Sequence, residues 1–189
     1  MKHCVFLTQK GGCGKSTLCN ELVYSLKRSG IPTAYIDLDQ QGSVLQPFED
    51  DGAAVCCIDT PGALSQHTAE WIAEADTIVI PTKASAHDMP VLQRMIDAVM
   101  VNAKENANAF VVVNMANRWT NCASFISWVT ELVNDTGIEV CTVSQAEAFP
   151  KASSYGVSVV DLEPRSKAAK ETKILMNKIR ASLDIEEED

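Results

Sequence analysis

The chain has 189 residues and a formal net charge of −9, with 46% hydrophobic and 22% charged residues. This length suits one domain with a sizeable core, and the composition is typical of a globular protein. The acidic balance argues against a surface coated with basic residues for nucleic acid, although it is compatible with a local basic patch. No run of 18 apolar residues occurs, and the apolar part of the N-terminus is too short for a signal peptide. The sequence therefore predicts a cytoplasmic protein without a membrane partner.

Short apolar runs alternate with amphipathic segments along the chain. The apolar runs predict buried parallel strands at residues 4–7, 34–36, 55–58, 77–80, 110–113 and 140–143. Helical spacing of apolar residues predicts helices around residues 18–26, 91–99 and 125–133, and a last helix from about Pro164 to Leu183. This alternation predicts an α/β fold, with a mostly parallel twisted sheet and helices on both faces. We expect one domain over residues 1–183, followed by an acidic tail at 184–189 that is frayed.

A glycine-rich loop joins the first predicted strand to the first predicted helix. It reads Gln9-Lys10-Gly11-Gly12-Cys13-Gly14-Lys15-Ser16-Thr17. Strand, glycine-rich loop and helix in this order form the context of a phosphate-binding loop, whose backbone N–H groups and helix N-terminus face phosphate oxygens. In such a loop Lys15 reaches the β- and γ-phosphates, Ser16 ligates Mg²⁺ and Thr17 binds the α-phosphate. The expected nucleotide-binding residues of the loop are Lys10, Gly11, Gly12, Cys13, Gly14, Lys15, Ser16 and Thr17.

Two later segments place carboxylates at the ends of predicted strands, where α/β sheets hold their ligands. Asp37 and Asp39 alternate after the strand at 34–36, and Asp59 follows the strand at 55–58 in the sequence Asp59-Thr60-Pro61-Gly62. Each aspartate alone could be an ordinary turn residue. Their order after a phosphate loop favours a metal-binding and water-positioning role, which hydrolysis of a phosphoanhydride requires.

Lys10 ahead of the glycine pair gives the loop the form KGGxGK[ST], with Gln9 where the usual loop begins with glycine. This form resembles the deviant Walker A motif of the ParA/MinD family of ATPases. The resemblance implies that ATP and Mg²⁺ are the cofactors, and that Lys10 reaches the ATP of the other subunit in a nucleotide-dependent homodimer. It also implies that Asp39 orients the attacking water and that Asp37 and Asp59 support Mg²⁺. The expected catalytic residues are thus Lys10, Lys15 and Asp39, and the expected metal-binding residues are Ser16, Asp37, Asp39 and Asp59.

The resemblance covers nearly the whole chain. Residues 75–88 are similar to a central segment of the family, and residues 111–114 are similar to its base-side strand, so that Asn114 either contacts adenine or serves as a cap or turn residue. The ending at 164–171 is similar to that of small ParA-type partition ATPases rather than MinD. Only about 15 residues separate Asp39 from the next strand, which still meets the minimum for a parallel crossover. This segment is shorter than family members usually have, which leaves open any contact that the family makes from it.

Four lysines share one arc of the last predicted helix, at roughly 100° per residue. The resemblance implies that they bind DNA without sequence preference, whereas a plain solvated helix face is the alternative. They are Lys167, Lys170, Lys173 and Lys178.

The resemblance implies an ATPase with slow intrinsic turnover that forms an ATP-sandwich dimer and positions a plasmid or chromosome on nonspecific DNA. A cargo-bound partner protein would stimulate hydrolysis, and the protein would then associate with the nucleoid. Three alternatives stay open: an ATPase serving a conjugation complex or another protein assembly, a dimerisation switch that hydrolyses almost nothing, and an amidoligase of cofactor synthesis.

Overall fold

A computed structural model describes residues 1–38, 52–62, 67–117 and 122–185. The strands described form one sheet, in the order β2-β3-β1-β4-β5-β6, and every pair of neighbours runs parallel. The strand bounds are β1 Lys2–Phe6, β2 Thr33–Asp37, β3 Val55–Asp59, β4 Thr77–Lys83, β5 Asn108–Ala116 and β6 Glu139–Ser144. The prediction of a parallel α/β sheet is therefore confirmed, and β2 lies at one of its edges.

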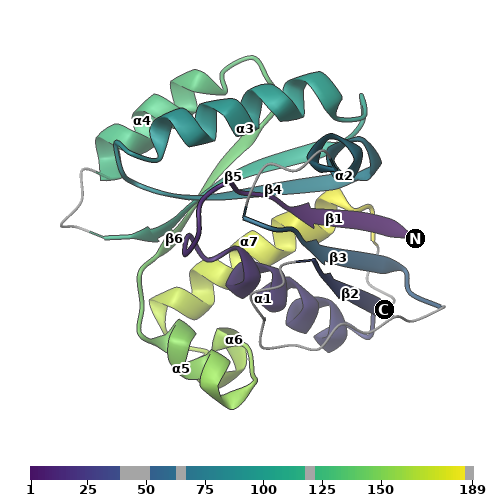
Figure 1. The fold of residues 1–189 in the computed structure, drawn as a ribbon. Coiled ribbons are helices and arrows are strands. Elements are labelled where there is room, and N and C mark those ends of the chain that lie inside the picture. The colour runs from purple at the N-terminus through teal and green to yellow at the C-terminus, as the bar shows by residue number, and fades with distance from the viewer. Residues whose placement is uncertain (39–51, 63–66, 118–121, 186–189) are drawn as a thin grey trace.

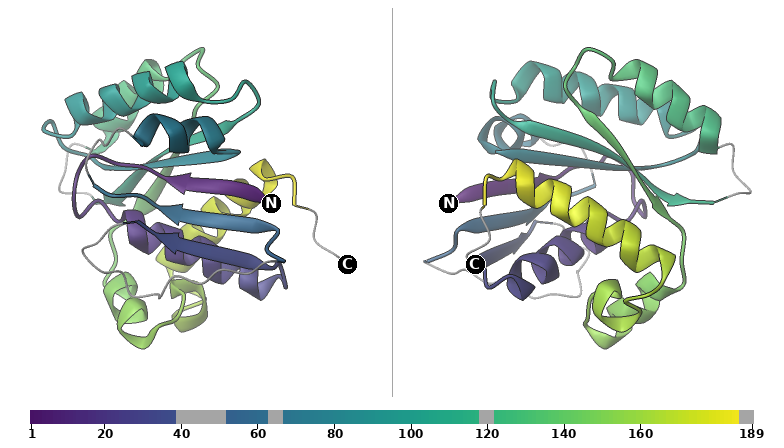
Figure 2. Two further views of the ribbon diagram at one scale, coloured as in Figure 1. Left: turned by 45° about the vertical axis from the view of Figure 1, so that its right-hand side comes forward. Right: turned by 180° about the vertical axis from the view of Figure 1, so that it is seen from behind.

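Helices cover both faces of the sheet (Figures 1 and 2). One face carries α1 (Lys15–Arg28) and α7 (Lys167–Ser182), and the other carries α2 (Thr68–Glu74), α3 (Met89–Asn102) and α4 (Cys122–Leu132). Because the strands are covered on both sides, their side chains divide between two apolar clusters, one under each helical layer. After β6 the chain forms α5 (Ala148–Tyr155) and α6 (Val159–Leu162), which pack next to the start of α7.

The last helix begins later than the sequence predicted. It starts at Lys167 instead of Pro164, because the Ser166 hydroxyl accepts a hydrogen bond of 3.1 Å from the Ala169 amide and so caps the first turn. Apolar residues are buried on one face of this helix, and they include Ala168, Leu175, Met176 and Ile179.

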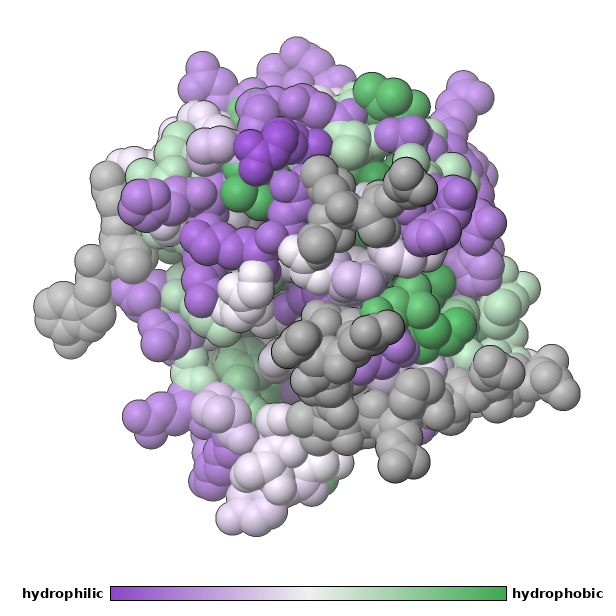
Figure 3. All heavy atoms as spheres, in the orientation of Figure 1, coloured by the Kyte–Doolittle hydropathy of each residue, from purple (hydrophilic) through white to green (hydrophobic). Residues whose placement is uncertain are grey.

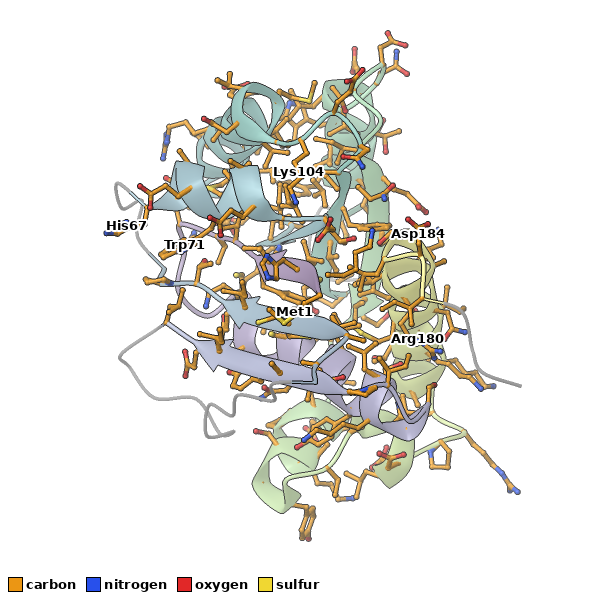
Figure 4. All side chains as sticks on the ribbon, turned by 90° about the vertical axis from the view of Figure 1, so that its right-hand side faces the viewer. Met1, His67, Trp71, Lys104, Arg180 and Asp184 are labelled. Carbon is orange, nitrogen blue, oxygen red and sulfur yellow. The ribbon has the colours of Figure 1, made fainter. Side chains whose placement is uncertain are left out.

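Ion pairs and hydrogen bonds of charged residues gather at the amino ends of the strands. This end of the sheet faces the viewer in Figure 4. Although partial burial raises the pKa of Asp76, the His3 amide at 2.8 Å and the ammonium groups of Lys104 and Lys2 bring it below its usual value. The last described residues lie at the same end of the sheet, where Asp184 lies 3.7 Å from Lys2 and Ile185 packs against the core. Residues 186–189 of the predicted tail lie outside the described residues.

The visible surface shows where apolar atoms gather. Among the coloured atoms of the face in Figure 3, apolar side chains form small separate groups within a hydrophilic surface. None of the described helices combines the length and apolar character that a membrane span requires.

A buried carboxylate connects α1 with α6. Glu21 accepts hydrogen bonds from the Ser158 hydroxyl at 2.5 Å and from the Val159 amide at 2.8 Å, and it is 4% exposed. Burial raises the pKa of Glu21 above its usual value of 4.5, against the opposing effect of these two donors. The first amides of a helix have no acceptor within it, and the Glu21 carboxylate provides that acceptor for the Val159 amide at the start of α6.

We expect Glu21→Ala to lower the free energy of unfolding by about 2–4 kcal/mol, since it leaves a buried amide unsatisfied and opens a cavity. Urea unfolding at pH 7 measures this loss.

Because the folded state binds the Glu21 proton more tightly, ionisation of Glu21 lowers stability as the pH rises above 4.5 through the folded-state pKa. Glu21→Gln should remove this part of the pH dependence while keeping the acceptor for the Val159 amide. If the stability of the wild type and that of Glu21→Gln depend on pH in the same way, Glu21 is not the buried group whose ionisation lowers stability.

Candidate functional site

The glycine-rich loop lies at the carboxyl end of β1, between the ends of β3 and β4. Gly12 and Gly14 adopt φ angles of 71° and 90°, a left-handed region that favours glycine. Gly14 is the N-cap of α1, so that the first amides of this helix open onto the loop. The backbone thus provides the anion-binding helix terminus that the sequence predicted.

Lys15 and Asp59 form a buried ion pair beneath the loop. Their side chains are 7% and 0% exposed, and the Lys15 ammonium donates to Asp59 Oδ1. Asp59 Oδ2 is also buried and has no hydrogen-bond partner within the described part of the chain. Burial raises the pKa of Asp59, and the negative charge of Asp37 adds to this, whereas Lys15 and the Ser16 hydroxyl oppose it. An unpaired carboxylate oxygen at this place provides a hard ligand for a cation or its bound water.

The strand register brings the predicted acids together. Asp37 ends β2 and pairs with Asp59 at the end of β3, which in turn pairs with Phe6 at the end of β1. Two of the three predicted carboxylates therefore lie side by side at the carboxyl ends of the strands, where the glycine-rich loop also lies. Asp39 falls within residues 39–51, which lie outside the described residues, so its predicted role stays a prediction.

Lys10 reaches a carboxylate of its own subunit. Its ammonium forms an ion pair with Asp88, which directly precedes α3. The Asp88 side chain is 5% exposed and that of Lys10 is 43% exposed, so the pair extends from the interior to the surface. The Lys10 amide also donates to the Thr8 hydroxyl over 3.3 Å. Sequence reasoning gave Asp88 no role of its own, since nothing local relates it to a lysine 78 positions earlier.

Asn114 holds the loop in place. Its Nδ2 donates to the Cys13 carbonyl over 2.8 Å, and its Oδ1 accepts from the Met115 amide at 2.9 Å. A Cβ at Gly14 would overlap Asn114 Nδ2, so this contact requires glycine there. Met115 adopts an unusual φ of 54° directly after it. The Asn114 amide is thus engaged by the loop itself, and because Asn114 also lines the neighbouring cavity, its contact with adenine stays a prediction.

A cavity of about 570 Å³ adjoins the loop on the side of β5 and β6. Its size falls within the usual range for small-molecule sites, which is about 300–1,000 Å³. The loop after β6 and the start of α5 provide much of its wall, which sequence reasoning did not identify as part of the site. The lining residues are Thr17, Leu18, Asn114, Met115, Ser144, Gln145, Ala146, Glu147, Phe149, Pro150 and Ser153.

These features together fit a nucleoside triphosphate with Mg²⁺. The glycine loop and the helix terminus suit a polyphosphate, the cavity suits a base and ribose, and the orphaned oxygen of Asp59 beside Ser16 suits a metal shell. The predicted residues Gly11, Gly12, Cys13, Gly14, Lys15, Ser16 and Thr17 are contiguous at this place.

The four lysines predicted on the last helix differ in their surroundings. Lys167 lies 3.4 Å from Glu171, and Lys178 forms an ion pair with Glu139, whose hydrogen bond raises the pKa of Lys178. Lys170 and Lys173 are exposed and have no ion pair within the described ranges. Two of these four lysines are therefore paired with acidic side chains of the same chain.

Comparisons with known proteins agree with this site. Residues 4–178 match the family model described as the CobQ/CobB/MinD/ParA nucleotide binding domain. The fold is similar to that of McdA from Cyanothece in complex with ATP, with 17% identity over 98% of this chain and 97% of that chain, and a TM-score of 0.76. A ParA family ATPase from Chlorobium tepidum TLS is 12% identical over 93% and 97% of the two chains, with a TM-score of 0.74.

The septum site-determining protein MinD from Pyrococcus horikoshii OT3, solved with Mg-ADP, is 12% identical over 94% of this chain and 95% of that chain, with a TM-score of 0.72. No match was found among curated protein sequences. At these identities the solved structures establish the fold, whereas the family model covers most of the sequence. The chain therefore belongs to the CobQ/CobB/MinD/ParA family of nucleotide-binding domains, whose members are ATPases that use ATP and Mg²⁺.

Proposed function

We propose that the protein is a ParA-like ATPase that closes on ATP into a homodimer and positions a plasmid or chromosome in the cytoplasm. The observation that carries this proposal is the glycine loop with Lys10 ahead of it, built on a parallel sheet of the ParA/MinD type. The Lys10 ammonium pairs with Asp88, so dimer closure requires this partly exposed side chain to exchange that carboxylate for phosphates of the other subunit.

The buried pair of Lys15 and Asp59 explains how the site accepts a polyanion. Lys15 neutralises Asp59 before binding, and it turns to the β- and γ-phosphates when they fill the loop. Mg²⁺ would supply charge neutralisation at the phosphates, held by Ser16 and by waters on Asp59 and Asp37. Asp39 would orient the water that attacks the γ-phosphorus as the bond to the bridging oxygen breaks. Asn114 fixes the Cys13 carbonyl, so that the loop amides stay directed at the phosphates.

We propose the exposed face of α7 as a contact for DNA of any sequence. Lys170 and Lys173 are the strongest candidates, because Lys167 and Lys178 have acidic neighbours. A cargo-bound partner protein would then stimulate hydrolysis and release the dimer. This proposal rests mainly on the resemblance to ParA-type proteins, to which the exposed lysines of α7 add a surface of suitable charge.

Binding to random-sequence duplex DNA tests the proposal. We expect binding with a non-hydrolysable ATP analogue, and little binding with ADP or without nucleotide. Lys170→Ala with Lys173→Ala should reduce the slope of log affinity against log salt by about 2, since each phosphate contact contributes about 0.9. Lys27→Ala, on α1, removes one exposed positive charge away from α7 and should leave this slope unchanged. A dimer that binds no DNA even at low salt would contradict the partition role.

A second candidate is an ATP-dependent dimerisation switch that serves a conjugation complex or another protein assembly. The net charge of −9 and the acidic partners of Lys167 and Lys178 favour it, since they weaken attraction to DNA. Dimers that form with ATP and ignore DNA at every salt concentration would support this candidate over the first.

A further inference from the structure

Lys83 ends β4 beside the glycine loop, and it takes part in none of the contacts described above. β4 lies between β1 and β5 in the sheet, so its carboxyl end is next to the loop that follows β1. Lys83 pairs in register with Asn114, and paired residues project from the same face of a sheet. Since the Asn114 amide reaches the Cys13 carbonyl, Lys83 projects toward the loop as well.

The position of its ammonium group agrees with this register. A Cβ added to Gly12 would lie 3.7 Å from Lys83 Nζ, so the charge lies against the backbone of the loop itself. Lys83 is partly buried and lines the same small cleft as Thr8, Lys10 and Cys13. This cleft is separate from the 570 Å³ cavity, whose lining does not include Lys83. The ammonium is therefore near the phosphate-binding backbone and away from the expected place of the base.

Three lysines surround the loop, and two of them are neutralised by acids of the same chain. Lys15 is paired with Asp59, and Lys10 is paired with Asp88. Lys83 has no ion pair and no side-chain hydrogen bond with any residue that the structure describes. A partly buried ammonium without a counterion loses hydration without compensation, and a bound anion would provide that compensation.

We propose that Lys83 is a further nucleotide-binding residue, which contacts the polyphosphate of a nucleoside di- or triphosphate on the Gly12 side of the loop. It adds a third cation to a site whose other two are internally compensated. Because the contact is to the polyphosphate, Lys83 increases the preference for di- and triphosphates over monophosphates. The proposal depends on nucleotide binding by the loop and is independent of DNA binding or cargo.

Titration calorimetry with Mg²⁺ and ADP, a non-hydrolysable ATP analogue or AMP tests this role. Lys83→Ala should weaken ADP and the ATP analogue about five- to tenfold, as expected for one partly exposed charged contact. AMP affinity, measured by competition, should change less than twofold. Lys83→Arg keeps the charge and should stay within about threefold of the wild type. The matched control Lys27→Ala removes an exposed lysine near the C-terminal end of α1 and should bind all three nucleotides as the wild type does.

Two outcomes would overturn the proposal. The first is ADP and analogue affinities of Lys83→Ala within twofold of the wild type, and the second is an equal loss for AMP, which would place the effect outside the polyphosphate. Thermal unfolding of the nucleotide-free variants shows whether they fold, and Lys83→Met retains the aliphatic stem if Lys83→Ala does not. Failure of DNA binding in the wild type would leave these affinities untouched, so the two proposals fail separately.

Discussion

Lys15→Met should abolish ATP turnover and also destabilise the nucleotide-free protein. Loss of the lysine removes a charge-assisted contact to the β- and γ-phosphates, so we expect turnover to fall by at least about 100-fold. The same change leaves Asp59 buried without its cation, and breaking a buried ion pair from one side costs about 3–5 kcal/mol. Phosphate release and urea unfolding at pH 7 measure the two effects.

A second substitution separates these two effects. Asp59→Asn in the Lys15→Met background removes the uncompensated charge, so we expect most of the lost stability to return while turnover stays absent. Burial already raises the pKa of Asp59, and removing Lys15 raises it further. The folded variant then binds the Asp59 proton more tightly than the unfolded chain does, so its deficit in stability should shrink as the pH falls. A Lys15→Met protein as stable as the wild type at pH 7 would show that the pair does not form.

Gly14→Ala should abolish nearly all nucleotide binding. The new Cβ would overlap Asn114 Nδ2, and the φ of 90° disfavours any residue with a side chain. Asn114 must then release the Cys13 carbonyl, so the loop loses the contact that directs its amides. We expect ADP affinity to fall at least about 100-fold and stability to fall by about 2–4 kcal/mol, from strain together with a lost hydrogen bond.

Gly30→Ala provides the matched control for Gly14→Ala. Gly30 follows α1 with a φ of 70°, and a Cβ there would meet no atom within 4 Å. The control therefore carries the backbone strain without the overlap, and should cost about 1–2 kcal/mol with unchanged ADP affinity. Equal losses of ADP affinity in the two variants would show that the hydrogen bond from Asn114 to the Cys13 carbonyl is not needed for nucleotide binding.

The sequence was sufficient for the fold and for the phosphate loop, because both are encoded over short distances. Apolar runs marked each strand, and the order of strand, glycines and helix marked the loop. Short helices were missed, since α6 has only 4 residues and depends on Glu21, which is 137 positions away from Ser158. The Ser158 hydroxyl caps α6 locally by accepting from the Val160 amide, but the Val159 amide is satisfied by the distant Glu21, which no local pattern predicts.

The contacts around the loop could not be predicted for the same physical reason. Asn114 reaches Cys13 across 101 positions, and Lys83 reaches the loop only because β4 lies next to β1 in the sheet. The order of strands decides such neighbours, and a periodic pattern contains no information about that order. The pairing of Lys10 with Asp88 likewise follows from the position of Asp88 at the start of α3, after β4, which lies next to β1 in the sheet.

The mass of the protein in solution, measured by light scattering with and without nucleotide, tests the central claim of ATP-driven dimerisation most directly. The chain has a mass of 20.5 kDa, and we expect this value without nucleotide and with Mg-ADP. A non-hydrolysable ATP analogue with Mg²⁺ should double it, and Lys10→Ala should bind the analogue yet keep the mass of one chain. Two results would contradict ATP-driven dimerisation through Lys10. The first is a wild type that keeps the mass of one chain with the analogue bound, and the second is a Lys10→Ala protein whose mass doubles as that of the wild type does.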